Sequence, residues 1–384
     1  MRKTITIGDL GTIITGKTPP TTNKNYYGDY AVFIKPTDIS EQCKFTYETE
    51  EMYSKLAAEK YESSLIPKGA ICVPCIGTIG TKMTMAPCDC YTNQSINSIV
   101  CNENYDNEYV YYLIKNFLPG LKAYNLGTAS GREYVSKSNF EKIELVAEQD
   151  KTIQKKIGEF LSRYDSLIEN YQKQIKLLEE AAQRLYKEWF VDLHFPGHEN
   201  TKIVDGVPVG WEKKPVDSIY SIKYGKNLST KLITADGNYP VYGANGVIGY
   251  FDKVNCNEQV VLITSRGNGS GDVLMTYHRN AFITNNSFIV NPLDEYNYCQ
   301  LPFTYQFLKN ANFRSVRTGA AQPQLTNQSI HTVDVVLPHK ELIVEYCKRT
   351  QMSNDVNIHL KNQIRLLTEA RDRLLPKLMS GEYI

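Results

Sequence analysis

The sequence predicts an α+β fold in which two β-rich mixed domains are separated by two long antiparallel helices that form a coiled coil. Three observations support this prediction: the chain repeats itself, each repeat ends in a long segment with heptad spacing, and the segments before these consist of short apolar runs broken by turn residues. The chain has 384 residues, of which 42% are hydrophobic and 22% charged, so it can bury more than one core.

The internal repeat is clearest in two segments that lie 189 residues apart, the difference between positions 363 and 174. Residues 174–181 read QIKLLEEA and residues 363–370 read QIRLLTEA, with six of the eight positions identical. Weaker similarity relates YTNQSINSIV at 91–100 to ITNNSFIV at 283–290, and a Gly-Lys pair follows a short apolar run in both halves. A repeat of this kind predicts two similar domains, each followed by a long helix.

The first long helix is predicted between Ile153 and Trp189, where apolar residues recur at steps of three and four. No proline or glycine interrupts this stripe after Gly158, and a rise of 1.5 Å per residue gives a rod of about 54 Å. A helix of this length extends beyond one globular domain. The predicted packing positions are Ile157, Tyr164, Tyr171, Leu178 and Leu185.

The second long helix is predicted from about residue 342 to residue 375, with Pro376 and Gly381 ending it. Its predicted packing positions are Val356, Leu360, Leu367 and Leu374. Two amphipathic rods in one chain bury their stripes most economically against each other, and the domain between them allows an antiparallel arrangement. The alternative, in which each helix packs on its own domain, explains the stripes but not the length.

These elements predict the domain boundaries. The first β-rich domain covers residues 1–147, the central helix 148–192, a connector 193–210, the second β-rich domain 211–338, and the C-terminal helix and tail 339–384. The connector region FPGHENTKIVDGVPVGW, residues 195–211, holds two prolines and three glycines. Predicted strands include 31–34, 70–73, 95–100, 260–264, 272–275 and 281–290, and a helix is predicted at 109–117.

The strongest enzymatic candidate is the glycine-rich segment from Arg266 to Asp272, which follows the apolar run VVLIT. Glycines after a strand can bring backbone N–H groups close to a nucleotide or a methyl donor. However, the following DVLMTY has strand character rather than opening a helix, so a turn between two strands is favoured. Residues 77–81 join two strand-like runs in the same way, and we expect no bound cofactor.

The cysteines do not predict a metal site. Cys72, Cys75, Cys88 and Cys90 form a loose set of four thiols, but the second pair is too closely spaced for a zinc knuckle and the second half has no counterpart. We therefore expect small buried thiols. Nine cysteines, an odd number, favour reduced thiols in the cytoplasm, and no window approaches the roughly 18 consecutive apolar residues of a membrane span.

Polar, turn-rich loops in both halves predict a nucleic-acid interface, because Lys and Thr bind phosphates while Arg, Asn and Gln pair with base edges. The first domain has 15 Lys and Arg against 16 Asp and Glu, net −1, and the second has 11 against 9, net +2, so the expected affinity is modest. The candidate DNA-binding residues are Lys17, Thr18, Lys24, Lys35, Thr37, Thr128, Arg132, Lys223, Lys226, Tyr242, Asn245, Arg266, Arg314, Arg317, Gln322 and Gln324.

Across nearly its whole length the chain resembles the specificity subunit of Type I restriction-modification systems. The segments that carry the resemblance are Leu10-Gly11, Gly16-Lys17-Thr18-Pro19, residues 33–39 (FIKPTDI), 68–71 (KGAI), 91–95 (YTNQS), 184–190 (RLYKEWF) and 374–382 (LLPKLMSGE). Two departures concern the Pro-Leu-x-Glu-Gln pattern that often precedes each long helix in this family. Residues 146–149 (VAEQ) lack the proline and residues 337–342 (LPHKEL) lack the glutamine.

The resemblance implies a non-catalytic subunit whose two target recognition domains each read one half of an asymmetric, gapped site in double-stranded DNA. It implies that the helices set the spacing and dock two methyltransferase subunits, and that a restriction and translocation subunit completes the complex, so that methylation, ATP use and cleavage reside in partners. Two alternatives stay open: a stand-alone DNA methyltransferase that uses the glycines of 266–271, and a coiled-coil adaptor that never contacts DNA.

Overall fold

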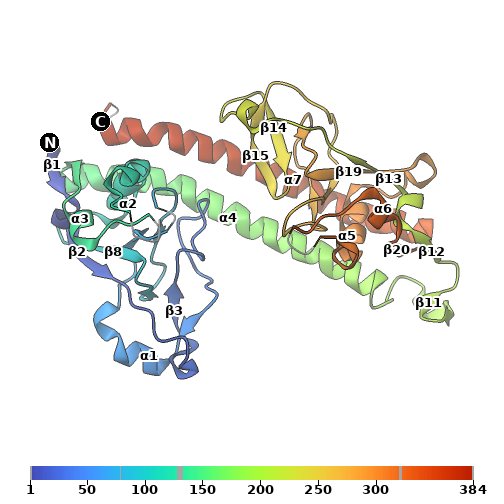
Figure 1. Cartoon of the computed structure of the whole chain (residues 1–384), viewed down its shortest axis with the longest axis horizontal. Helices are drawn as coiled ribbons and strands as arrows, with labels where there is room; N and C mark the ends of the chain where they lie inside the picture. Colours follow the sequence, from blue (N-terminus) through green and yellow to red (C-terminus); the bar gives the residue numbers. More distant parts are fainter. Residues whose placement is uncertain (1, 78, 128–132, 320–321, 383–384) are drawn as a thin grey trace. The chain divides into compact units, whose positions relative to one another are not determined.

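The computed structural model describes residues 2–77, 79–127, 133–319 and 322–382 (Figure 1). The chain forms two compact units. Unit 1 comprises Met1–Asn170 and Ile364–Ile384, and unit 2 comprises Tyr171–Gln363. Each unit combines a β-rich domain with parts of two long helices, so the predicted α+β class is confirmed. Among the described residues, the long helices included, no helix has a stretch apolar enough to cross a bilayer.

The β-rich domain of unit 1 contains three small sheets. One pairs β1 (Arg2–Thr6) with β9 (Glu144–Glu148), and a four-stranded sheet has the order β2 (Gly11–Thr15), β8 (Ile96–Cys101), β5 (Ile71–Pro74), β6 (Thr84–Met85). The third has the order β4 (Met52–Tyr53), β3 (Tyr27–Ile34), β7 (Tyr91–Thr92), with β3 and β7 parallel. The helices of this domain are α1 (Lys55–Lys60), α2 (Asn107–Phe117) and α3 (Lys137–Glu141), and α2 confirms the helix predicted at 109–117.

After a connector hairpin of β10 (Ile203–Val204) and β11 (Val207–Pro208), the β-rich domain of unit 2 repeats this topology strand for strand. Its sheets are β12 (Glu212–Pro215) with β20 (Asp334–Leu337), then β13 (Tyr220–Tyr224), β19 (Ser287–Pro292), β16 (Val261–Thr264), β17 (Val273–Met275), and finally β15 (Gly246–Phe251), β14 (Tyr239–Gly243), β18 (Phe282–Ile283). The β14–β18 pair is parallel, like β3–β7. Helices α5 (Leu301–Asn310) and α6 (Asn327–His331) correspond to α2 and α3. The internal repeat predicted from sequence is therefore confirmed.

One predicted strand is wrong. The apolar stretch from Ala281 to Val290 forms two strands in different sheets, because β18 ends at Ile283 and β19 begins at Ser287. Between them, the Asn285 N–H donates to the Lys226 carbonyl at 3.0 Å and the Ser265 N–H donates to the Asn286 carbonyl at 2.8 Å. Asparagine favours turns of this kind. Because strand-like residues lie on both sides of this turn, the sequence pattern does not show that the strand is interrupted there.

The two long helices are α4 (Lys151–Phe190, 40 residues) and α7 (Lys340–Ser380, 41 residues). In unit 2, Glu179 of α4 contacts Asn357 and Lys361 of α7, whereas Ala182, further along α4, accepts a hydrogen bond from Tyr346, earlier in α7. As the residue number rises along α4, the residue number of its contact in α7 falls. The two helices are therefore antiparallel, as predicted. In unit 1, Asp165 of α4 likewise pairs with Arg371 of α7.

Of the two residues predicted to end the second helix, Pro376 does not, because α7 continues to Ser380, whereas Gly381, with φ +88°, ends it as predicted. A proline this close to a C-terminus removes only one hydrogen bond of the helix. The final turn is held by other contacts of unit 1. The Arg2 guanidinium donates to the Leu378 carbonyl at 2.8 Å and also to the Met379 carbonyl, and both of these side chains are buried in the core.

The faces that the long helices bury differ partly from the predicted stripes. Ile157 and Leu360 are buried, and Tyr164, Tyr171, Leu178, Leu185, Leu367 and Leu374 are half-buried. Val356 is 38% exposed, and the adjacent Asn357 takes the buried position. The shift arises because each helix packs on its neighbouring domain as well as on the other helix, which is why Ile157 belongs to the main core of unit 1. The alternative that each helix packs on its own domain is thus partly correct.

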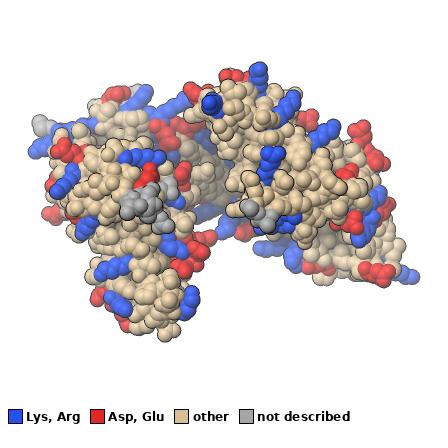
Figure 2. Space-filling model, in the orientation of Figure 1, with Lys and Arg blue, Asp and Glu red and all other residues tan. Residues whose placement is uncertain are grey.

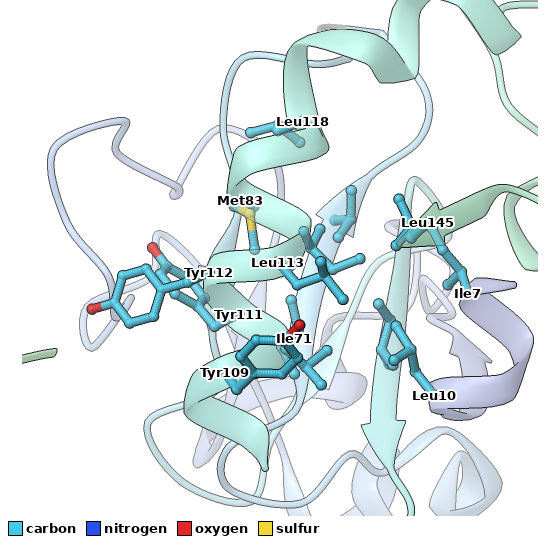
Figure 3. Packing of buried hydrophobic residues seen from close by; sticks show 14 of the residues in the cluster. Ile7, Leu10, Ile71, Met83, Tyr109, Tyr111, Tyr112, Leu113, Leu118 and Leu145 are labelled. Atoms are coloured by element: carbon cyan, nitrogen blue, oxygen red, sulfur yellow. The ribbon is translucent and has the colours of Figure 1, made fainter. Parts of the chain in front are cut away.

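Helix α2 lies in the middle of the unit 1 core. Figure 3 shows Leu113 on the side that faces Leu10 and Leu145, while the rings of Tyr111 and Tyr112 point the opposite way. Such a helix needs apolar residues on more than one face, and all six residues from Tyr109 to Ile114 are buried. The face of α2 with Leu113 therefore packs on the side of the strands, and the face with Tyr111 and Tyr112 can contact the long helices.

The tyrosine face of α2 meets a buried ion pair between the long helices. Asp165, 6% exposed, accepts hydrogen bonds from the Tyr112 hydroxyl and from the guanidinium of Arg371, which is 4% exposed. Arg371 also pairs with Asp372 at 2.8 Å. Burial, together with the Asp165 carboxylate, raises the pKa of Tyr112 above its ordinary range, so its hydroxyl remains a donor. These groups connect α2, α4 and α7.

We expect Arg371→Ala to lower the free energy of unfolding by about 3 kcal/mol, because it leaves the Asp165 carboxylate buried without its counter-charge. The matched control is Arg373→Ala, which removes an exposed arginine from the same helix and should change stability by less than about 0.5 kcal/mol. Urea denaturation of the full chain measures both. Equal losses in the two variants would contradict the role assigned to this ion pair.

Candidate nucleic-acid interface

A Gly-Lys turn follows the first strand of the four-stranded sheet in each unit. In unit 1 the Lys17 N–H donates to the Thr92 carbonyl at 2.9 Å, and in unit 2 the Lys226 N–H donates to the Ile283 carbonyl at 3.0 Å. A Cβ on Gly16 would lie 2.1 Å from the Thr92 oxygen, and one on Gly225 would lie 2.3 Å from the Thr284 oxygen. Only glycine allows this close approach, which explains why the pair occurs in both halves.

Around the unit 1 turn, the predicted residues Lys17, Thr18 and Lys24 are exposed. The Lys17 ammonium contacts the Ser63 hydroxyl at 3.2 Å. The Thr18 hydroxyl donates to the side chain of Gln94, which lies in the loop between β7 and β8. These contacts with exposed groups leave the side chains at the surface, where a ligand can reach them.

Lys35 is placed differently. Its ammonium is half-buried and pairs with Glu50 at 2.7 Å and Glu51 at 3.3 Å. Although burial opposes the charge, the hydrogen bonds to these two carboxylates raise the pKa of Lys35 above its ordinary value. Lys35 is therefore committed to partners within the domain, whereas Thr37, two residues on, is exposed. The remaining unit 1 candidates, Thr128 and Arg132, lie outside the described residues.

In unit 2 the glycine-rich segment forms the turn between the antiparallel strands β16 and β17, as favoured from the sequence. This turn packs against the loop that follows α5. Arg266 forms a β-bridge with Gln324, and the Gly267 N–H donates to the Pro323 carbonyl at 2.9 Å. The turn and the loop thus form one surface.

Two arginines of this loop are held by the glycine-rich turn. The Arg314 guanidinium donates to the Asp272 carboxylate at 3.1 Å, and the Arg317 guanidinium donates to the Asn268 carbonyl at 3.3 Å. Gly271 has φ +89°, and a Cβ there would lie 3.2 Å from the Arg314 backbone nitrogen. This glycine therefore serves the close packing of the turn against an arginine loop.

Further candidates border the same surface. The Tyr224 hydroxyl donates to the Leu325 carbonyl at 3.2 Å, which brings the end of β13, with the exposed Lys223 and Lys226, to this loop. The Asn245 side-chain oxygen lies 3.3 Å from the position that a Cβ of Gly269 would occupy. The structure thus gathers the following predicted residues along one edge of unit 2: Lys223, Lys226, Asn245, Arg266, Arg314, Arg317 and Gln324, with the exposed Gln322 in the same loop.

Tyr242 is not part of this surface. It is 1% exposed, its hydroxyl is 2.9 Å from His278 Nδ1, and it accepts the Tyr277 N–H at 3.2 Å. The prediction failed because Tyr242 packs in an apolar cluster with Val260, Leu262 and Ile283, which lie elsewhere in the sequence. The glycine- and asparagine-containing stretch that follows Tyr242 at the end of β14 resembles an exposed loop, and nothing in the local sequence indicates that the tyrosine side chain is buried.

Two further residues of the unit 2 edge are not among the predicted DNA-binding residues. Tyr224 is 40% exposed and directly precedes the Gly-Lys pair, and Asn268 is exposed at the tip of the glycine-rich turn. The position of Tyr224 beside that repeated pair could have identified it. Figure 2 shows basic and acidic side chains interspersed on the visible face, as expected from the near-zero net charge of +1.

The cysteine set of unit 1 consists of three buried residues and the exposed Cys88. Burial raises the pKa of Cys72 and of Cys75 to about 12, so both remain neutral thiols. Across the described ranges, no group of three or more His, Cys, Asp or Glu residues is placed to hold a metal ion.

The fold and its two polar edges define a protein with duplicated recognition domains attached to a pair of helices. The family model "Type I restriction modification DNA specificity domain" matches residues 2–180 and again 208–366. The chain belongs to this family, whose members recognise DNA sequences for Type I restriction-modification systems.

Individual relatives agree with this assignment. The chain is 26% identical over 404 aligned residues to the Type I restriction enzyme MjaIX specificity subunit of Methanocaldococcus jannaschii, with 98% of this chain and 92% of that protein covered. It is 37% identical over 158 residues to the HindI specificity subunit of Haemophilus influenzae, covering 39% and 33% of the two chains. The crystal structure of the S subunit from Mycoplasma genitalium shares the fold, with a TM-score of 0.59, 18% identity, and 98% and 96% of the chains covered.

We expect Arg266→Ala to weaken DNA binding by roughly 5- to 150-fold, because no described hydrogen bond or ion pair occupies this side chain and a paired arginine contributes about 1–3 kcal/mol of base discrimination. Lys202→Ala is the matched control, since it removes one exposed positive charge from the connector. Titration of the assembled complex with labelled target DNA measures both. An Arg266→Ala complex that binds like the control would exclude Arg266 from the interface.

Proposed function

We propose that this chain is the non-catalytic, sequence-reading subunit of a Type I restriction-modification complex. Residues 1–147 and 211–338 are its target recognition domains, and each reads one half of an asymmetric, gapped site in double-stranded DNA. One observation carries this proposal. Both domains have a polar edge formed by equivalent strands and the same Gly-Lys turn, but the side chains around the turn differ.

The differences between the two edges support the reading of two unlike half-sites. At the shared Gly-Lys turn the exposed residue after the lysine is Thr18 in unit 1 and Asn227 in unit 2, and the described part of unit 2 also presents Arg266 and Gln324. Arginine pairs with guanine and glutamine with adenine, while lysine and threonine mainly contact phosphates. Two dissimilar readers on one chain permit an asymmetric target, which a symmetric dimer does not.

We assign to the helices of residues 148–192 and 339–384 the spacing of the two half-sites and the docking of two methyltransferase subunits, with 193–210 as a connector. Support for the spacing role comes from the continuity of α4 and α7, each of which contributes residues to both units. For docking, the supporting observation is that each helix leaves large apolar side chains exposed seven or eight residues apart, a spacing that places them on one helix face. These include Phe160 and Leu167 in unit 1 and Val344 and Met352 in unit 2.

Methyl transfer, ATP use and DNA cleavage then belong to partner subunits, and the complex acts in the cytoplasm. Support comes from the glycine-rich turn, whose Gly271 packs against the Arg314 loop rather than opening a helix toward a cofactor. The structure pairs none of the nine cysteines in a disulfide, which suits a reducing compartment.

Exchange of residues 211–338 for those of a related subunit should change one half of the recognised sequence and leave the other half and the gap unchanged, because each domain reads independently. Sequencing of the methylated sites made by the reconstituted methyltransferase complex measures this. The matched control is the reciprocal exchange of residues 1–147, which should change only the other half. A change in both halves from either exchange would refute the modular reading.

A further inference from the structure

A small cavity of about 30 Å³ lies in unit 2 where α5 meets the two long helices. Its lining includes Glu179 and Ala182 of α4, Gln306 of α5, and Thr350, Asn354 and Asn357 of α7. Gln306 is 3% exposed and Asn357 is 5% exposed. Among the described residues, neither the Gln306 Oε1 atom nor the Asn357 Oδ1 atom has a hydrogen-bond partner.

The internal repeat relates this cavity to the buried ion pair of unit 1. The segments QIKLLEEA and QIRLLTEA are followed by Ala182 and Arg371, so Ala182 occupies the position of Arg371. The same 189-residue step, 371 minus 182, relates Asn354 to Asp165. Alignment of Lys309-Asn310 in α5 with Lys115-Asn116 in α2 places Gln306 at the position of Tyr112.

Each member of the unit 1 network thus has a substitute in unit 2. An arginine has become an alanine, which opens space, and an aspartate has become a neutral asparagine. The tyrosine hydroxyl, a donor to Asp165 in unit 1, is replaced by a glutamine, whose amide carries an acceptor oxygen as well as N–H donors, and it is this oxygen that has no partner among the described residues. The cavity therefore lies at the place that a guanidinium fills in unit 1.

The polar atoms that line the cavity indicate which kind of ligand it can hold. Two buried acceptors without partners require a donor, because unpaired buried polar atoms are destabilising. A cation is unfavourable, since the nearby Glu179 carboxylate is already paired with Lys361 at 3.0 Å and a second positive charge would be buried without compensation. Water is neutral, donates two hydrogen bonds, and needs only about 10–15 Å³ of such volume.

We propose that this cavity is a binding site for internal water, which donates hydrogen bonds to Gln306 Oε1 and Asn357 Oδ1. The water connects α5 to α7 in unit 2, as the hydrogen bond from Tyr112 to Asp165 connects α2 to α4 in unit 1. Since α5 leads directly into the loop with Arg314, the water also supports the base of that loop.

The variant Gln306→Met tests this site, because methionine has nearly the shape of glutamine but cannot accept the hydrogen bond. If water is bound, the full chain should unfold at a Tm lower by about 2–4 °C. If the cavity is dry, the substitution removes an unsatisfied acceptor and the Tm should rise or stay unchanged, which would overturn the proposal. Gln183→Met, on the exposed face of α4, is the matched control and should leave the Tm unchanged.

A crystal structure of the unaltered full chain at a resolution that resolves ordered water provides a test that does not depend on the variant. Electron density for water within hydrogen-bond distance of both the Gln306 and the Asn357 oxygen is expected. A cavity without such density, or one in which those two oxygens contact protein donors instead, would overturn the proposal.

Discussion

The antiparallel packing of α4 against α7 is the constraint on which the rest of this structure depends. Unit 1 combines residues 1–170 with residues 364–384, so its core exists only if the end of the chain returns to the beginning. Leu375, Leu378 and Met379 of α7 lie in the same buried cluster as Leu10 and Ile71 of the first domain. The hydrogen bonds from Arg2 to the last turn of α7 complete this closure, and a cation there also suits the negative end of a helix dipole.

The repeat uses one architecture but two kinds of helix contact. In unit 1 a buried ion pair with a tyrosine donor joins the domain to the helices, whereas in unit 2 the helices share the more exposed Glu179–Lys361 pair and meet the domain mainly through aromatic packing. Tyr186, Phe303 and Tyr346 pack together in unit 2, with ring centroids 6.0–6.2 Å apart, and Arg349 lies 4.8 Å from the Trp189 ring. The contacts between helices and domain therefore differ in chemistry between the two units.

Much of this architecture could be predicted because the spacing of apolar residues and the internal repeat are visible in the sequence. The repeat, the two long helices and the helix at α2 all depend on spacing that local sequence displays. The failures came from tertiary context. Burial of Tyr242 depends on its packing with residues of other strands, such as Leu262 and Ile283. The continuation of α7 past Pro376 depends on contacts with Arg2, and the burial of Asn357 beside the exposed Val356 depends on how α5 packs on the helix pair.

The candidate interface was predictable in composition but not in arrangement. Arg266, Arg314 and Gln324 are 58 positions apart at most, 324 minus 266, yet they meet because the β16–β17 turn packs against the loop after α5. Conversely, Lys35 resembled the other lysines in sequence but is paired with Glu50 and Glu51. Which polar side chains are available to DNA is decided by these contacts within each domain.

The central claim, that the paired helices set the spacing of the two half-sites, is tested most directly by lengthening both helices together. Seven residues inserted after Lys173 in α4 and seven near Gln363 in α7 preserve the heptad phase and add about 10 Å, or about three base pairs. Methylated sites sequenced from the reconstituted complex should show both half-sequences unchanged and the gap longer by about three base pairs. The same insertion at Asp205-Gly206 in the connector should leave the gap as it was, and an unchanged gap after the paired insertion would contradict the account.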